Sequence, residues 1–180
     1  MCQECEKPVH GLTRRAFVTS ATTAGLLCLG VPARAGAEAL ELPKPKPMDA
    51  CPVCGMLVAP YPYWIATVLF SDGSADHFDG AKDLFKYLHD MPKYARGRTK
   101  DAIRAIGVTD YYTPDQRIDA RAAIYVVGSD VLGPMGHEFV PLADAADAAE
   151  FMKDHKGKRT LTFEEATLAL ALALDESRFE

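Results

Sequence analysis

The sequence predicts an α+β protein made of two pseudo-repeated ββαβ halves, followed by a C-terminal helix and preceded by a disordered leader. The main observation is that the order strand, strand, helix, strand occurs twice, over residues 64–112 and 122–163. The second is that 180 residues, 48% of them hydrophobic, can bury a core as one domain or two small ones. The two copies share their order of elements more than their sequence.

Hydrophobic periodicity and turn residues place the elements of the first half, in the order strand, strand, helix, strand, at 64–70, 75–78, 81–90 and 103–112. Pro92 ends the helix, and the basic stretch 93–100 is predicted to be a loop. Asp79 precedes the helix, and we expect its carboxylate to cap the helix rather than to bind a metal.

The same signals place the elements of the second half at 122–127, 137–142, 144–155 and 159–163. A glycine-rich connection over 128–136 joins its first two strands. An Ala- and Leu-rich segment, 164–176, predicts the final helix, with Thr162 and Glu165 as its capping pair. In this arrangement, loops from the two halves can face each other.

The N-terminal segment resembles a twin-arginine export signal. Arg14 and Arg15 precede an apolar run over 17–31 that is too short and too polar to span a membrane comfortably. A small-residue cleavage site follows at 33–35. We therefore expect a periplasmic protein. A lipid anchor at Cys28 is the less favoured alternative, because the large Leu27 directly precedes it.

These features divide the chain into a signal segment, a proline-rich linker, and a domain with two halves, over 1–35, 36–50 and 51–176, with the halves at about 51–115 and 120–165. The formal net charge of -5 disfavours a non-specific nucleic-acid surface. The sequence has no nucleophile elbow, phosphate loop or dinucleotide fingerprint. We expect neither a nucleic-acid partner nor an enzyme.

The chemistry is concentrated in C-x-x-C-G-M over residues 51–56, where Cys51, Cys54 and Met56 bring three sulfur side chains together. Thiolates and thioethers are soft ligands that select Cu(I), and thiolates also bind zinc and iron–sulfur clusters. A second methionine, Met135, lies between glycines in a loop, and His137 follows it. These residues are candidates for one Cu(I) site formed by two loops.

Three alternatives remain open for Cys51 and Cys54. A structural zinc site needs two further ligands, and no second cysteine pair or spaced histidine pair remains after signal removal. A thiol–disulfide oxidoreductase uses the same spacing but places it at a helix start, whereas the nearby prolines predict a loop here. A disulfide that staples a binding module suits an oxidising compartment.

Several motifs in a fixed order resemble the nitrous oxide reductase accessory protein NosL family over roughly residues 48–167. They are C-x-x-C-G-M at 51–56, Phe-Asp-Gly at 78–80 before a helix, Ala-Ile-Tyr-Val at 123–126, Gly-Pro-Met-Gly at 133–136, and an acidic, Ala-rich helix ending in a Lys-Gly turn. The resemblance implies two ββαβ halves related to the organomercurial lyase domain.

The resemblance also implies a periplasmic Cu(I) chaperone, usually a membrane-anchored lipoprotein. Such a chaperone supplies copper for the copper–sulfide cluster of nitrous oxide reductase. Its partner would be this copper-accepting apo-enzyme or the assembly machinery. By position, the implied copper ligands are Cys54, Met56 and Met135, with Cys51 and His137 as further candidates. The chain departs from the family pattern in its twin-arginine-like leader and in the basic stretch 93–100.

Overall fold

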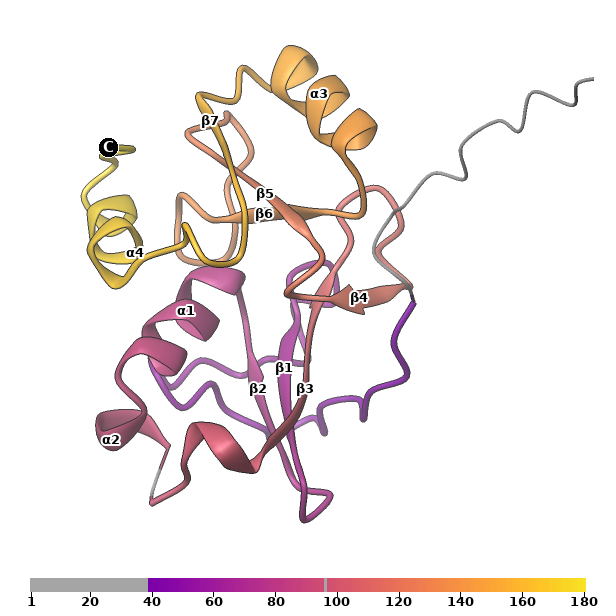
Figure 1. The fold of residues 1–180 in the computed structure, drawn as a ribbon, viewed down its shortest axis with the longest axis vertical. Coiled ribbons are helices and arrows are strands. Elements are labelled where there is room, and N and C mark those ends of the chain that lie inside the picture. Colours follow the sequence, from indigo (N-terminus) through magenta and orange to yellow (C-terminus); the bar gives the residue numbers. More distant parts are fainter. Residues whose placement is uncertain (1–38, 96) are drawn as a thin grey trace, which may run out of the picture. The chain divides into compact units, whose positions relative to one another are not determined.

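Two antiparallel sheets form the framework of the described residues, 39–95 and 97–180, in the computed structural model (Figure 1). The first sheet has the order β2-β1-β3-β4, with strands Ala75–Phe78, Ala66–Phe70, Ile103–Thr109 and Arg117–Asp119. The second sheet has the order β6-β5-β7, with strands Val140–Leu142, Ile124–Val127 and Arg159–Leu161. The predicted leader lies outside the described residues.

The pairing of strands confirms the predicted repeat. In each half the first strand is central and pairs with the second and the last strand. Ala66 of β1 lies opposite Phe78 and Val108, just as Tyr125 of β5 lies opposite Pro141 and Leu161. A helix connects the second strand to the last in both halves, so the α+β class with two ββαβ halves and a C-terminal helix is confirmed.

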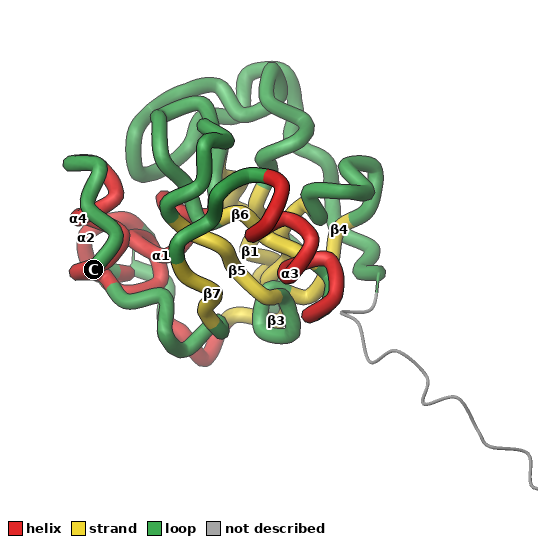
Figure 2. Tube along the Cα trace, turned by 90° about the horizontal axis from the view of Figure 1, so that it is seen from above, coloured by secondary structure: helices red, strands yellow, loops and turns green. Residues whose placement is uncertain are grey.

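The helices are α1, α2, the short 3-10 helix η1, α3 and α4, at Ala81–His89, Met91–Tyr94, Lys100–Ala102, Ala145–Asp154 and Leu168–Asp175. Figure 2 shows α3 against the strands of the second sheet, while α4 lies beside α1 (Figure 1). Nearly every residue of α1 is buried, because α4, strands β1 and β2 and aromatic rings of the second half pack against it. Helix α1 therefore lies where the two halves meet.

Aromatic packing around Phe85 of α1 joins the halves. Its ring contacts the rings of Tyr125, Phe139 and Phe163 from the second half, with centroids 5.1, 4.9 and 5.3 Å away. The contacts with Tyr125 and Phe139 are edge-to-face, and such contacts add to the stabilisation that the buried apolar area provides. One hydrophobic cluster consequently includes residues of both halves.

Several element boundaries differ from prediction, and the short helix α2 takes up the start of the predicted loop 93–100. Strand β6 begins at Val140 rather than at residue 137, because the preceding residues form a tight turn and bury Glu138. Helix α4 begins at Leu168 rather than at residue 164, because the Thr167 side chain accepts a hydrogen bond from the Leu170 N–H and caps the helix there. The short edge strand β4 was not predicted.

Part of the predicted linker lies along the first sheet. The Leu40 N–H donates to the Arg117 carbonyl at 2.7 Å, and the Leu42 side chain covers Gly107 of β3 so closely that a Cβ there would clash. The domain boundaries themselves stay predictions. Within the part of the chain that the structure describes, no helix is long and apolar enough to cross a membrane.

Candidate metal centre

The cysteine loop is closed by its own backbone. Ala50 and Leu57 pair as an antiparallel bridge, the Cys51 N–H donates to the Met56 carbonyl at 2.8 Å, and the Gly55 N–H donates to the Cys51 carbonyl at 2.9 Å. Gly55 has a φ of 80°, a left-handed conformation that a side chain would strain. The C-x-x-C-G spacing therefore makes a tight turn.

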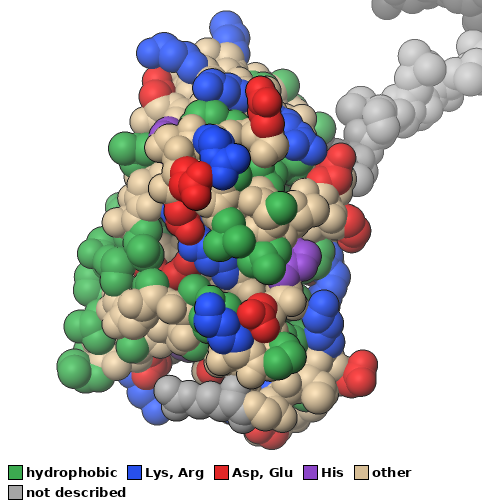
Figure 3. Space-filling model, turned by 90° about the vertical axis from the view of Figure 1, so that its left-hand side faces the viewer, with side chains coloured by type: hydrophobic (Ala, Val, Ile, Leu, Met, Phe, Trp, Pro, Cys, Tyr) green, Lys and Arg blue, Asp and Glu red, His purple; other side chains and the backbone are tan. Residues whose placement is uncertain are grey.

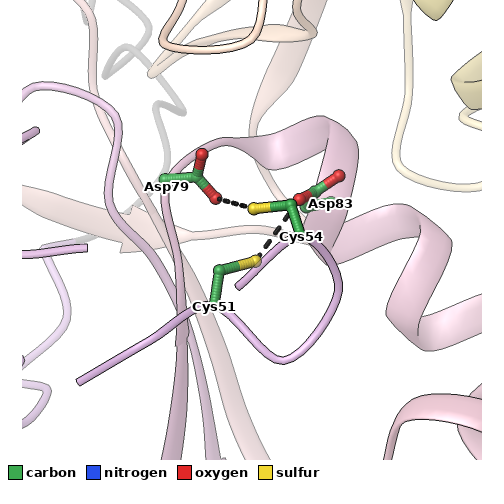
Figure 4. Close-up of side chains that lie close together, drawn as sticks. All are labelled: Cys51, Cys54, Asp79 and Asp83. Carbon is green, nitrogen blue, oxygen red and sulfur yellow. Dashed lines mark hydrogen bonds between the residues drawn. The ribbon is translucent and has the colours of Figure 1, made fainter. Parts of the chain in front are cut away.

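Both cysteine sulfurs face carboxylates at the start of α1 (Figure 4). The Cys54 thiol donates to Asp79 Oδ1 at 3.2 Å, and the Cys51 thiol donates to Asp83 Oδ2 at 3.3 Å. Cys51 is buried, Cys54 is half-buried, and both are free thiols. Asp79 does not cap α1 as predicted: the N-cap is Gly80, and the Lys82 N–H in the first turn donates to Glu138 Oε2 instead.

The surroundings keep both thiols protonated. Burial raises the pKa of Cys54 to about 12, and hydrogen bonds to Asp83 and Asp79 together with the Asp83 charge act in the same direction. Burial raises the pKa of Cys51 further still, and the Asp83 charge adds to it. Without a cation, both groups are therefore neutral near pH 7, and a metal must displace their protons.

Four potential ligand atoms, from Cys51, Cys54, Asp79 and Asp83, lie within 4.8 Å of one another. Asp83 Oδ1 is buried without a hydrogen-bond partner, although the Lys86 ammonium lies 3.3 Å from it. Such a set of thiols and carboxylates can hold a metal ion once the thiols ionise.

The sequence analysis did not identify Asp83 as a member of this cluster, and it assigned Asp79 to helix capping rather than to metal binding. A weak signal was present, since Asp79 and Asp83 are four residues apart and can lie on one side of a helix start.

Of the predicted ligands, Cys51 and Cys54 lie together, and Met56 is on the same loop with a half-buried side chain. Met135 is 41% exposed, and its backbone carbonyl accepts a hydrogen bond from Lys82 Nζ at 2.9 Å. This contact brings the Met135 loop to the helix turn that carries Asp83.

His137 packs against the C-terminal tail. Its ring makes an edge-to-face contact with Phe179 in the C-terminal tail, with centroids 4.8 Å apart. The structure therefore shows a packing role for His137, and its role as a copper ligand stays a prediction.

Fold and site together define a small α+β protein of two ββαβ halves, with a cluster of thiols and carboxylates against a buried helix. The family model of NosL matches residues 43–171, and the chain belongs to the NosL family. This confirms the family that the sequence motifs predicted.

Two of the relatives bear on what the site could bind. The chain is 32% identical over 124 residues to the copper-binding lipoprotein NosL of Stutzerimonas stutzeri, which covers 68% of this chain and 64% of that protein. It also resembles the crystal structure of the copper chaperone NosL from Shewanella denitrificans, with 26% identity and a TM-score of 0.60, over 72% of this chain and 97% of that one. Both names refer to copper.

Proposed function

We propose that this protein binds Cu(I) and passes it to a copper-accepting apo-enzyme, acting as a chaperone rather than as an enzyme. The observation that carries the proposal is the pair of free thiols, Cys51 and Cys54, on one tight loop beside the Met56 thioether. Soft sulfur ligands favour Cu(I) over harder cations. The copper-related names of both relatives support the same cargo.

The proposed copper ligands are Cys51, Cys54, Met56 and Met135, with His137 as a further candidate. When Cu(I) binds the two thiols, two protons leave and two Cu–S bonds form. In the metal-free site, Asp79 and Asp83 accept the S–H hydrogen bonds and so hold both sulfurs in place. A half-buried Cys54 and an exposed Met135 leave the cargo accessible to an acceptor.

The proposed location is the periplasm, reached through the twin-arginine-like signal over residues 1–35. The proposed client is nitrous oxide reductase or its assembly machinery. The Stutzerimonas stutzeri relative is a lipoprotein by name, so a lipid anchor at Cys28 is retained as an alternative to a freely diffusing product.

On the face that Figure 3 shows, acidic and basic side chains are interspersed, without one extended basic patch.

The thiol–disulfide oxidoreductase alternative is disfavoured by electrostatics. Such enzymes need a thiolate near neutral pH and therefore a lowered cysteine pKa. Here burial and two neighbouring carboxylates raise the pKa of Cys54 to about 12, which suppresses the nucleophile.

Copper binding is tested by anaerobic competition with a chromophoric Cu(I) chelator. In all samples Cys2, Cys5 and Cys28 are replaced by Ser, so that Cys51 and Cys54 are the remaining thiols of the five; this protein is called the two-thiol chain below. We expect one Cu(I) per chain and an ultraviolet sulfur-to-copper band. The variant Cys54→Ser should lose most of the affinity. A two-thiol chain that cannot compete with a weak chelator would refute the proposal.

Delivery is tested by mixing the copper-loaded two-thiol chain with apo-nitrous oxide reductase and separating the two proteins. We expect copper to move to the enzyme, and the loaded Cys54→Ser variant to transfer less. Copper that stays on the donor while free Cu(I) loads the enzyme would rule out this client but not copper binding.

A further inference from the structure

A fully buried lysine holds one of the two loops that the proposed copper site needs, and the next residue, Asp83, contacts the other. Lys82 is the second residue of α1 and has an exposed fraction of 0%. Its ammonium donates to the Met135 carbonyl at 2.9 Å and pairs with Asp175 of α4 at 3.0 Å. A buried ammonium is costly to leave unpaired, so both contacts hold their partners firmly.

The backbone of Lys82 fastens the same loop at a second point. Its N–H donates to Glu138 Oε2 at 2.8 Å, so one residue holds both Met135 and Glu138. Met135 itself lies in a sharp turn, because Gly133 and Gly136 on either side of it exchange backbone hydrogen bonds of 2.8 and 3.2 Å. The methionine therefore sits at the tip of a hairpin whose orientation depends on Lys82.

The helix turn that contains Lys82 also orders the cysteine loop. The next residue, Asp83, accepts the Cys51 thiol, and Asp79 accepts the Cys54 thiol. Lys86 pairs with Asp83 at 3.3 Å and with Asp175 at 2.8 Å, so Asp175 of α4 links the two lysines. The cysteine loop and the Met135 loop are thus both held by residues at the start of α1.

We propose that Lys82 is a positioning residue for copper: by holding the Met135 carbonyl, it sets where the Met135 thioether lies relative to the cysteine sulfurs. The inference rests on the proposed Cu(I) function. It assigns a role to a lysine that cannot itself bind a cation while it is charged.

The test is a double-mutant cycle in the two-thiol chain, with Lys82→Leu, Met135→Leu and both together. Partners that orient a metal ligand typically contribute about 10–100-fold to affinity, so we expect Lys82→Leu to weaken Cu(I) binding about tenfold. If Lys82 acts through Met135, then adding Lys82→Leu to the Met135→Leu variant should weaken binding by less than about twofold. Lys153→Leu, which removes an exposed lysine from α3, is the charge-matched control.

X-ray absorption at the copper edge counts the sulfur neighbours of copper, which a loss of stability alone would not change. We expect one fewer sulfur neighbour around copper in Lys82→Leu and in Met135→Leu, and the wild-type number in Lys153→Leu. Should Lys82→Leu fail to fold by circular dichroism, Lys82→Gln is measured in its place, because it keeps a donor but is one atom too short to hold the Met135 carbonyl in the same place.

The outcomes separate this inference from the proposed function. Loss of affinity that is additive with Met135→Leu, or an unchanged sulfur count in a folded Lys82 variant, would overturn the positioning role. The same holds if Met135→Leu binds copper as tightly as the parent protein. Failure of the parent two-thiol chain to bind Cu(I) would instead overturn the proposed function.

Discussion

At the scale of single residues, the thiol protons of Cys51 and Cys54 control the proposed copper chemistry. Each thiol donates to a carboxylate, and burial together with these negative charges raises both pKa values, that of Cys54 to about 12. Each cysteine that becomes a copper ligand must therefore release one proton near neutral pH.

The apparent Cu(I) affinity should consequently rise with pH. With two cysteine ligands we expect it to increase about 100-fold per pH unit between pH 6 and 8, and about tenfold per unit in Cys51→Ser. Chelator competition at several pH values measures this, with the proton affinity of the chelator corrected in parallel. An affinity that does not change with pH would mean that neither thiol is a ligand.

Glu138 allows a pH test of stability without copper. Burial raises its pKa to about 8, although the Lys82 ammonium and backbone N–H act in the opposite direction. A carboxyl whose pKa is higher in the folded state stabilises the fold while it is protonated. This contribution is complete below the unfolded pKa of about 4.5 and is lost as the pH rises through about 8.

We therefore expect the free energy of unfolding to fall by on the order of 3 kcal/mol between pH 5 and 8. The variant Glu138→Gln keeps an oxygen acceptor for the Lys82 N–H and should flatten this dependence. Urea unfolding at each pH measures it. Equal pH profiles for the two proteins would show that Glu138 keeps an ordinary pKa in the folded state.

At the scale of elements, the start of α4 shows how two capping signals compete. Thr162 and Glu165 do interact, since the Thr162 N–H donates to Glu165 Oε2 at 2.8 Å. The helix nevertheless begins only at Leu168, four residues after the predicted start at Glu164. Phe163 instead packs against Phe85, with ring centroids 5.3 Å apart. Tertiary packing of one aromatic side chain thus overrides a local helix signal.

Two threonine substitutions distinguish these helix starts. Thr167→Ala removes the side chain that caps the Leu170 N–H and should cost about 1 kcal/mol of unfolding free energy. Thr162→Ala leaves the backbone bond to Glu165 intact and should cost less than about 0.5 kcal/mol. Urea unfolding of both variants measures the difference. A larger loss for Thr162→Ala would place the functional cap at the earlier site.

At the scale of the whole molecule, the sequence predicts the elements well and the long-range contacts poorly. Hydrophobic patterns of period two and of helical period, together with turn residues, predict both ββαβ halves. The partners of Cys51, Cys54 and Lys82 could not be predicted, because Asp83 is 32 residues from Cys51, Asp79 is 25 from Cys54, and Met135 is 53 from Lys82. Such contacts depend on how the halves dock, which periodicity does not encode.

The docking of the halves suggests that they unfold as one cooperative unit. Phe70 of β1, Phe85 of α1, and Tyr125 and Phe139 of the second half belong to one buried cluster. Loss of packing in one half should therefore weaken the other, because this shared cluster holds buried side chains of both halves. The second half also has a smaller cluster of its own around Val126, Val140 and Phe151.

Hydrogen exchange in two phenylalanine variants tests this cooperativity. Phe70→Ala removes a core ring of the first sheet, and Phe85→Ala removes the ring that contacts the second half; each should cost about 3–5 kcal/mol. If the molecule unfolds cooperatively, then within each variant the slowest amides of β1 and those of β5 lose the same free energy of protection. If Phe70→Ala left the β5 amides fully protected, the halves would be independent folding units, and the link from Lys82 to Met135 would join two separately stable bodies.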